Sequence, residues 1–515
     1  MFRKKLAIIV LVSIILTGCS ATLTETGQEG ETSHFQTMEE DPDLSYEIPE
    51  SSPHVLVNQL GYATSAAKVA IFCGSEIPDQ FQVIDSDTGE IVYTGETEKR
   101  DIQESDGSQI GYGDFSEVET TGSYYIEAPI LGESYTFQIA DRMYDDVLKE
   151  SLKQYYYNRC GSTLTEEYAG SQSHNACHTE YAVLREDSTV SLDVSGGWHQ
   201  NGDGSKDVAK AAESIGILLL SYELFGDVYT DEMGLPESRN GIPDLLDEVR
   251  YEVDWLLKMQ NAKTGEVYSG VTMSTAEKGK TTSAVVEEPS LQAAKAFVMS
   301  LAKFSYLYQD YDQDYASSCL QAANRTWRYI VQNEKGESTD SWKFAAAAEL
   351  YRVSGSKDCN TCLEEFFKEN PEIAEDDLEY FLGSVTYMMT TRQVNKEYCS
   401  EQIEQLLREA ETLSTQMKKQ PFYVCANEDQ TNQMELLQDM LWLVTVNHII
   451  TNYEYETVIE NHLHYFMGRN KLAISYIDDV GIRNYKDYNE NLGIMNQFDE
   501  NSRLVFMLSE IVSLE

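Results

Sequence analysis

The chain has 515 residues, of which 42% are hydrophobic, 11% aromatic and 24% charged, which is typical of a globular protein with two or three folding units. It carries 38 Lys and Arg against 87 Asp and Glu, so its formal net charge is −49. Such a charge repels nucleic acid and anionic lipid, which excludes both as electrostatic partners, whereas neutral and cationic substrates remain compatible.

The N-terminus has the features of an export signal. Three basic residues at 3–5 precede an apolar stretch at 6–16 that is too short to span a bilayer as a mature helix. The sequence Leu-Thr-Gly-Cys, ending at Cys19, resembles a bacterial lipobox. We therefore expect residues 1–19 to be a lipoprotein signal peptide. The mature chain would lie at the extracellular face of the cell membrane, anchored only through lipid on Cys19; an ordinary signal peptide is the alternative.

Two segments of different composition follow. Residues 20–53 are rich in Ser, Thr and Glu and have no apolar periodicity, which predicts a disordered tether. Residues 54–141 contain seven short runs rich in β-branched and aromatic residues, separated by turn signals. This strand number favours a β-sandwich of the Ig-like type, although the Cys-Trp-Cys spacing of antibody domains is absent.

Apolar residues take a helical period in residues 142–515. In 243–260, for example, Leu246, Val249 and Val253 share one helix face. Twelve helices are predicted, over residues 145–158, 206–225, 243–260, 290–309, 314–333, 341–353, 361–368, 376–390, 396–417, 432–451, 453–467 and 499–514. This number indicates a closed ring of helical hairpins or a solenoid, and the absence of a visible repeat argues against the solenoid.

Residue types that bind metals gather in one region. Sixteen residues separate Cys160 from Cys177, His178 follows directly, and His199 comes shortly before the second predicted helix. Two thiolates and two imidazoles satisfy zinc in a closed structural site. Because the spacing is not that of a zinc finger, a buried thiol pair or a disulfide with unrelated histidines is the alternative.

The stretch GGWHQNGD, residues 196–203, ends in a carboxylate at a glycine-flanked turn. Such a turn can point a short side chain into a cleft. Inverting hydrolysis of a glycosidic bond needs one carboxylate to activate water and one carboxylic acid to protonate the leaving oxygen. Asp203 is a candidate for the first role, and capping the following helix is the alternative.

Several motifs resemble those of glycoside hydrolase family 9, in members that carry an N-terminal cellulase-type Ig-like domain. They occur in the family's order: VNQLGY, YGDFSEVETTGSYYIEA, NACHTEYA, DVSGGWHQNGD, LPESRNGIPDLLDEVRYEVDWLLKMQ and YFMGRN. The resemblance covers nearly all of the chain from residue 54. It implies an Ig-like β-sandwich followed by an all-α (α/α)6 barrel over 142–515, and inverting, endoglucanase-like hydrolysis of β-1,4-glucan.

The resemblance also implies roles for single residues. A structural zinc would be held by Cys160, Cys177, His178 and His199, and would fix the loop that carries Asp203. The family's GGWHDAGD reads GGWHQNGD here, so a water-binding amide, Gln200, replaces the first carboxylate, whereas Asp203 keeps the place of the general base. Calcium often accompanies this fold, but no ligands for it are assigned.

The general acid is left open by the resemblance. In the family it is the Glu of an Asn-Glu dipeptide, which falls on Met495 without gaps and on Asn489-Glu490 after a short shift. Glu490 is the predicted acid, and Glu500, expected at the start of the last helix, is another candidate. A His-bearing sugar-binding loop of the family is missing.

Three functions are therefore compared. The first is a monomeric glycoside hydrolase that acts on β-1,4-glucan or a related β-linked polysaccharide or oligosaccharide at the cell surface. The second is a glycan-binding lipoprotein without turnover, which Gln200 and the unassigned acid favour. The third is a helical scaffold or protein-interaction subunit that descends from an enzyme, and no residue specifically favours it.

Overall fold

The computed structural model describes residues 53–103, 107–274, 283–334, 340–370, 372–374, 377–425, 432–489 and 492–515. The predicted signal peptide, Cys19 and the tether up to residue 52 lie outside the described residues. Among the helices that are described, none is both long and apolar enough to cross a membrane.

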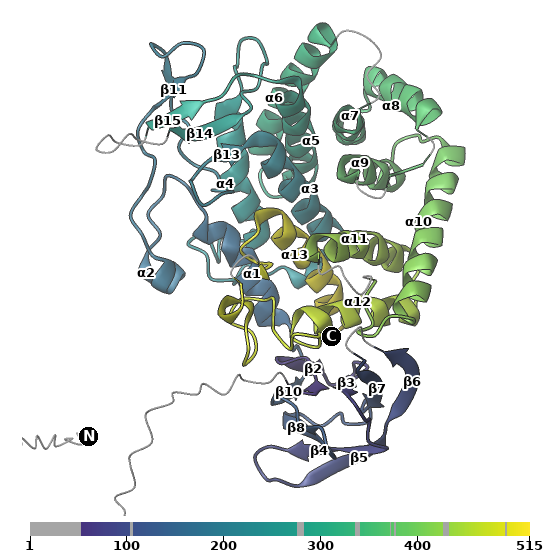
Figure 1. Ribbon diagram of the computed structural model, residues 1–515. Coiled ribbons are helices and arrows are strands. Elements are labelled where there is room, and N and C mark those ends of the chain that lie inside the picture. Colours follow the sequence, from purple (N-terminus) through teal and green to yellow (C-terminus); the bar gives the residue numbers. More distant parts are fainter. Residues whose placement is uncertain are drawn as a thin grey trace, which may run out of the picture. The chain divides into compact units, whose positions relative to one another are not determined.

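The N-terminal part consists of two packed sheets (Figure 1). One has the strand order β1-β3-β7-β6 and the other β2-β10-β8-β4-β5, with β9 paired to β8. All of these strand pairs are antiparallel except β10 with β2. The strands are β1 (Val55–Leu56), β2 (Gly61–Ala63), β3 (Val69–Gly74), β4 (Gln80–Asp85), β5 (Ile91–Glu96), β6 (Glu98–Gln103), β7 (Gln109–Asp114), β8 (Gly122–Ala128), β9 (Gly132–Glu133) and β10 (Phe137–Ala140).

Alternating side chains explain how the two sheets pack. In β8, Tyr124 and Ile126 are buried, whereas Tyr125 and Glu127 face outward. Residues of both sheets, such as Phe72 and Ile126, belong to one buried cluster. The predicted β-sandwich is confirmed, with more and shorter strands than the seven runs indicated.

The remaining chain is mainly helical, and all twelve predicted helices are present within a few residues of their expected bounds. The described residues add one short helix, α2, and give thirteen α-helices: α1 (Asp145–Tyr157), α2 (Glu166–Ala169), α3 (Val208–Phe225), α4 (Asp244–Met259), α5 (Leu291–Tyr308), α6 (Gln313–Asn333), α7 (Ser341–Ser354), α8 (Lys357–Glu369), α9 (Leu378–Met389), α10 (Lys396–Met417), α11 (Gln433–Ile449), α12 (Tyr453–Phe466) and α13 (Phe498–Leu514).

The helices of this part, whose arrangement is drawn in Figure 1, fall into two groups by how much of their surface is buried. Helices α3, α5, α7, α9, α11 and α13 are buried around most of their circumference, whereas α6, α8 and α10 bury one face. The buried helices contact one another in the order α9, α7, α5, α3, α13, α11. The predicted helical domain is thus confirmed as paired inner and outer helices around a shared core.

A five-stranded sheet in the helical part was not predicted. Its order is β12-β11-β15-β14-β13, with β11 (Ala182–Leu184), β12 (Ser191–Leu192), β13 (Lys206–Asp207), β14 (Gly270–Ser274) and β15 (Ser283–Val286). The prediction that a helix starts at Lys206 was wrong, because residues 206–207 pair with β14 as a strand. Asp207 is instead the N-cap of α3, and its carboxylate accepts the backbone N–H groups of Ala209 and Lys210.

The sandwich and the helical part both lie within the compact unit of residues 52–515. Tyr112 donates its hydroxyl hydrogen to the Pro421 carbonyl at 2.9 Å, and the Gln59 amide donates to the Ala473 carbonyl at 2.8 Å. The expected boundary at residues 141–142 falls between β10 and α1.

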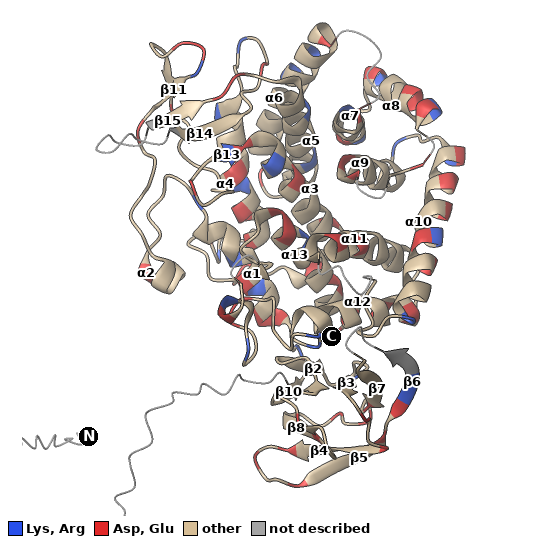
Figure 2. Cartoon of the chain, viewed as in Figure 1, with Lys and Arg blue, Asp and Glu red and all other residues tan. Residues whose placement is uncertain are grey.

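Acidic residues are frequent in the helical part, notably along α8 and α10 (Figure 2). Several glutamates there are partly enclosed. Burial raises the pKa of five of them to about 7: Glu213, Glu379, Glu460, Glu500 and Glu510. A carboxyl whose pKa is raised by folding binds its proton more tightly in the native state. Each of these groups therefore lowers stability as pH rises from the unfolded pKa near 4.5 to the folded pKa near 7.

Replacing Glu213 with glutamine is expected to stabilise the protein at about pH 7.5, because the amide cannot ionise. The expected gain is about 1–2 kcal/mol, with almost none at about pH 4, where the wild-type carboxyl is mostly protonated in both the folded and the unfolded state. Thermal unfolding followed by circular dichroism at both pH values measures the difference. The exposed Glu404 on α10 supplies the control Glu404→Gln. Equal gains at both pH values would contradict this explanation.

Candidate functional site

Two loops meet beside the end of α1. The backbone N–H of Cys160 donates to the Gly197 carbonyl at 2.7 Å, and that of His199 donates to the Asn158 carbonyl at 2.8 Å. Gly197 has a φ of +72°, and a Cβ there would lie 2.7 Å from Cγ of Trp255. Only glycine allows this close approach, so Gly197 lets the motif's loop pack directly on α4.

Trp198 anchors the same loop from below. Its side chain is fully buried, and its indole N–H donates to Oε1 of Glu248 at 2.7 Å. Its backbone N–H donates to Oε2 of Glu252 at 2.5 Å. The indole packs on Tyr155 with ring centroids 4.8 Å apart. Trp198 therefore packs beneath the loop and is unavailable for stacking on a sugar.

The four predicted metal ligands converge. One ligand atom from each of Cys160, Cys177, His178 and His199 lies within 4.8 Å of the others. Sγ of Cys160 is 3.7 Å from Nδ1 of His178, and Sγ of Cys177 is 3.2 Å from Nε2 of His199. Zinc bonds of about 2.0–2.3 Å in a tetrahedron place neighbouring ligand atoms about 3.3–3.8 Å apart. The chemistry and spacing of the donors fit such an ion, although the group itself does not identify the metal.

Neighbouring groups orient these side chains and favour the protonation states in which they can bind a metal. Nδ1 of His199 lies 3.0 Å from the Gly204 carbonyl, which fixes the ring hydrogen there and turns Nε2 toward Cys177. Hydrogen bonding with Cys160, and then with His199, lowers the pKa of the Cys177 thiol, which favours the thiolate that binds metal. The buried Lys206 donates its ammonium hydrogen to Sγ of Cys160 at 3.5 Å.

Gly204, the residue after Asp203, packs closely against the metal-type ligands. Its φ is +81°, and a Cβ would lie 3.0 Å from Cε1 of His178 and 3.4 Å from Nδ1 of His199. The backbone of Gly204 therefore packs directly on two of the predicted ligands.

Asp203 lies in a polar turn at the exposed side of the loop. Its Oδ1 accepts the backbone N–H of Ser205 at 2.9 Å and the Ser205 hydroxyl at 2.6 Å. These bonds lower the pKa of the carboxyl, which is therefore ionised at neutral pH. The same turn recurs at Asp187 and Asp193, so its geometry alone does not distinguish a catalytic group. The alternative that Asp203 caps α3 is wrong, because Asp207 is the cap.

Gln200 connects the loop to β13. Its amide N–H donates to the Asp207 carbonyl at 2.9 Å, and its Oε1 accepts the Asp207 backbone N–H at 2.7 Å. One N–H and one lone pair of the amide remain for other partners. The predicted role of Gln200 in holding a water therefore depends on these two remaining positions.

A cavity of about 180 Å³ adjoins the loop. It is lined by Gln154, Tyr155, Asn158, His199, Gln200, Asn201, Gly202, Met495, Asn496, Phe498 and Asn501. No carboxylate is present among these described lining residues. Met495, the ungapped position of the acid, is 3% exposed and lies in this cavity wall.

Of the two candidates for the general acid, one lies among the described residues and the other does not. Glu490 lies outside the described residues. Glu500 lies in the first turn of α13, as expected, and is half-buried. Burial raises the pKa of its carboxyl to about 7, so a large fraction is protonated at neutral pH.

One group of oxygen ligands was missed from the sequence. Asp231, Asp244 and Asp247 place carboxylate oxygens within 4.8 Å of one another. Oδ1 of Asp244 is buried and has no hydrogen-bond partner among the described residues. Hard oxygen donors of this kind suit calcium. The sequence signal was the spacing of Asp244 and Asp247, which places both on one face of the first turn of α4.

Comparisons with known proteins agree with this architecture. The family model described as Glycosyl hydrolase family 9 matches residues 144–491, and that described as Cellulase N-terminal ig-like domain matches residues 50–133. A cellodextrinase of Butyrivibrio fibrisolvens is 28% identical over 476 residues, which cover 84% of this chain and 86% of the relative. A xyloglucan-specific endo-beta-1,4-glucanase of Bacteroides ovatus is 27% identical over 507 residues, covering 87% and 84%.

Solved structures resemble the fold over the same extent. A metagenome-derived glycoside hydrolase family 9 endoglucanase superposes with a TM-score of 0.80 at 23% identity, covering 89% of this chain and 99% of its own. A relative solved with cellobiose-like isofagomine gives a TM-score of 0.77 at 23% identity, covering 90% and 100%. The family model spans well over half of the chain. The chain therefore belongs to glycosyl hydrolase family 9, a family of glycoside hydrolases acting on β-1,4-glucans, and carries that family's cellulase-type Ig-like domain.

Proposed function

We propose that the protein hydrolyses β-1,4-linked glucan chains with inversion, and that Asp203 activates the attacking water. The observation that carries this proposal is the placement of Asp203, an exposed ionised carboxylate on a loop fixed by the convergent Cys and His ligands. The names of its relatives support the substrate class, since they include a cellodextrinase and an endo-beta-1,4-glucanase, and a solved relative holds a cellobiose-like compound.

In this mechanism the metal supplies no reacting group. Bound zinc would hold Cys160, Cys177, His178 and His199 together and so keep their loop rigid. Asp203 takes a proton from water as the water attacks the anomeric carbon. A carboxylic acid on the other side of the bond, Glu490 or Glu500, protonates the leaving oxygen. The raised pKa of Glu500 suits that role near neutral pH.

The location and assembly belong to the same proposal. Lipid on Cys19 would anchor a monomer at the extracellular face of the membrane, and residues 20–53 would hold the enzyme away from it. Calcium at Asp231, Asp244 and Asp247 would stabilise the start of α4.

The stereochemistry of the first product tests the proposal. The protein is incubated with cellotetraose, and proton NMR follows the anomer that forms before mutarotation. Inversion of a β-linkage yields the α-anomer first. Initial formation of the β-anomer would refute the inverting mechanism, and the absence of any product would refute the hydrolase.

Met495 favours a second candidate, a glycan-binding protein without turnover. A thioether cannot donate the proton that the leaving oxygen needs, and Met495 occupies the cavity wall where the family's acid aligns. If this position lacks its acid, Met495→Glu is expected to raise hydrolysis of cellotetraose by ~10²-fold or more. Met495→Gln is the matched control, because it has similar volume but no acidic proton. This candidate would be excluded if the wild type hydrolyses cellotetraose and Met495→Glu hydrolyses it at the same rate.

A further inference from the structure

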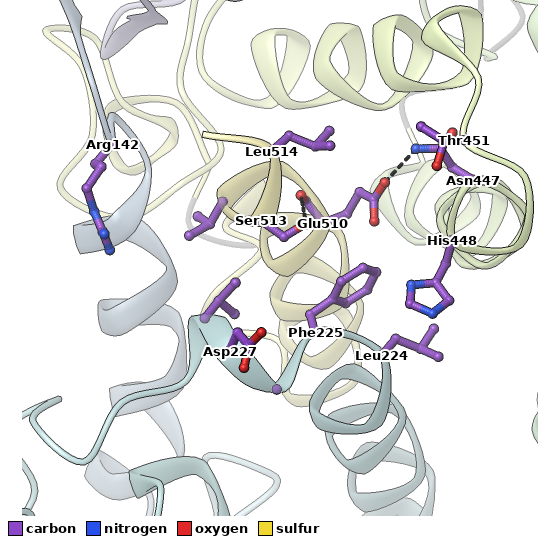
Figure 3. A pocket seen from close by; sticks show the side chains of 13 residues that line it. Arg142, Leu224, Phe225, Asp227, Asn447, His448, Thr451, Glu510, Ser513 and Leu514 are labelled. Carbon is purple, nitrogen blue, oxygen red and sulfur yellow. Dashed lines mark hydrogen bonds between the residues drawn. The ribbon is translucent and has the colours of Figure 1, made fainter.

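A second cavity, of about 560 Å³, lies away from the metal ligands, where α3, α11 and α13 end (Figure 3). Its volume is within the range of small-molecule sites, about 300–1,000 Å³. Residues from the last turns of all three helices line it, among them Phe225, His448 and Glu510. The proposed hydrolysis uses none of these residues.

Glu510 is the deepest charged group of this cavity. It is only 3% exposed, and its Oε1 accepts the Asn447 amide N–H at 2.6 Å. The Asn447 oxygen in turn accepts the backbone N–H of Asn452 at 2.8 Å, which fixes the orientation of the amide. Among the described residues no salt bridge to Glu510 is found. Figure 3 shows its second oxygen directed away from Asn447, on the side of Phe225 and His448.

The surroundings of Glu510 favour a positive ligand. The C-terminal ends of three helices carry partial negative charge, and Asp227 adds a carboxylate to the wall. Arg142 is the one cationic side chain among the described lining residues, and it forms an ion pair with Asp145. Burial lowers the pKa of His448, so its ring is neutral near neutral pH. A buried carboxylate without a cation therefore faces a cavity of net negative potential.

Apolar side chains form the rest of the wall. Leu224, Phe225, Val228, Val512 and Leu514 offer a carbon surface. The Phe225 ring meets the His448 ring edge-on, with centroids 5.4 Å apart, which holds the aromatic face in place. A ligand that fits has a compact carbon skeleton and one protonated amine.

We propose that this cavity is a binding site for a small organic ammonium ion, with its ammonium group on Glu510 and its carbon skeleton against Phe225. One carboxylate oxygen would keep accepting the Asn447 amide N–H, and the second oxygen would accept a charge-assisted hydrogen bond from the ligand. The site is separate from the proposed catalytic loop and does not depend on its chemistry.

The proposed site has an expected pH dependence. Burial raises the pKa of Glu510 to about 7, the Asn447 hydrogen bond opposes this, and Glu456 on α12 adds to it. Affinity should therefore rise between about pH 5.5 and about pH 8, as Glu510 ionises. His448, whose pKa is lowered by burial, adds no positive charge near neutral pH, whereas Arg142 stays charged throughout.

The experiment compares cyclohexylammonium with its neutral isostere cyclohexanol by isothermal titration calorimetry at about pH 8. Wild-type protein is expected to bind the ammonium ion at least about tenfold more tightly than cyclohexanol. Glu510→Gln keeps the oxygen that accepts the Asn447 amide N–H but removes the charge, and should weaken ammonium binding by about tenfold or more. Glu404→Gln on the surface of α10 is the matched control and should bind as wild type does.

Two further variants keep the test decisive even if Glu510→Gln fails to fold. Asp227→Asn, at an exposed lining residue, should weaken ammonium binding about two- to threefold. Asp203→Asn should leave binding unchanged, whatever it does to hydrolysis. The proposal is overturned if folded Glu510→Gln binds cyclohexylammonium as wild type does, if Asp227→Asn has no effect, or if cyclohexanol binds equally well.

Discussion

The substitution Asp203→Asn is expected to lower the hydrolysis of β-1,4-glucan by a factor of ~10²–10⁴, the usual contribution of a general base. The amide oxygen introduced by this change can still accept the Ser205 hydroxyl hydrogen, so the turn should persist. What is lost is the ionised group that removes a proton from water. Release of reducing ends from a soluble β-glucan, with wild type and variant at equal concentration, measures the effect.

The chain provides a matched control for this variant. Asp187 accepts the backbone N–H of Thr189 at 2.9 Å and its hydroxyl at 2.6 Å, almost the same bonds that Asp203 makes with Ser205. Asp187→Asn should therefore disturb its turn as much as Asp203→Asn does, but should leave the rate of hydrolysis unchanged. If both variants lose activity equally, or if neither loses any, Asp203 is not the base.

The second large effect concerns the metal ligands. Cys177→Ser is expected to abolish stoichiometric zinc binding and to reduce the free energy of unfolding by several kcal/mol, because a closed zinc site contributes its binding energy to folding. The same loss should follow when a strong chelator removes the metal from the wild type. Elemental analysis of the purified protein measures zinc, and thermal unfolding measures stability.

Cys399→Ser serves as the control for this change. Cys399 is a half-buried free thiol on α10, outside the metal group. This variant should keep its zinc and nearly all of its stability. Two results would contradict the assignment of these four ligands. One is wild-type protein that contains no zinc although the cells grew in zinc-containing medium, and the other is a Cys177→Ser variant that still contains zinc.

The sequence was most informative where a pattern repeats over many residues. Helix α10 has its predicted bounds, Lys396–Met417, because its apolar face recurs over six turns. Helix α4 begins directly after Pro243, as a proline at a helix start indicates. The grouping of Cys160, Cys177, His178 and His199 was also predicted, since their residue types are rare enough to be noticed individually.

Features that depend on distant partners could not be predicted in this way. Strand β13 has two residues, too few to show a period, and exists because β14 pairs with it. The hydrogen bonds between the Gln200 side-chain amide and the Asp207 backbone depend on the same local fold, which brings β13 beside the loop. Likewise, the grouping of Asp231 with Asp244 and Asp247 results from a loop that folds back on α4.

The loop that carries Asp203 is fixed at both ends. On one side His199 is tied to the Cys and His group, and on the other Asp207 both pairs with β14 and caps α3, an inner helix. A single inserted or deleted residue between these two fixed points would displace the carboxylate or break one of the attachments. We therefore expect homologous chains to keep the length of this segment constant. Differences in their preference among glycans should instead arise in loops that are not fixed at both ends.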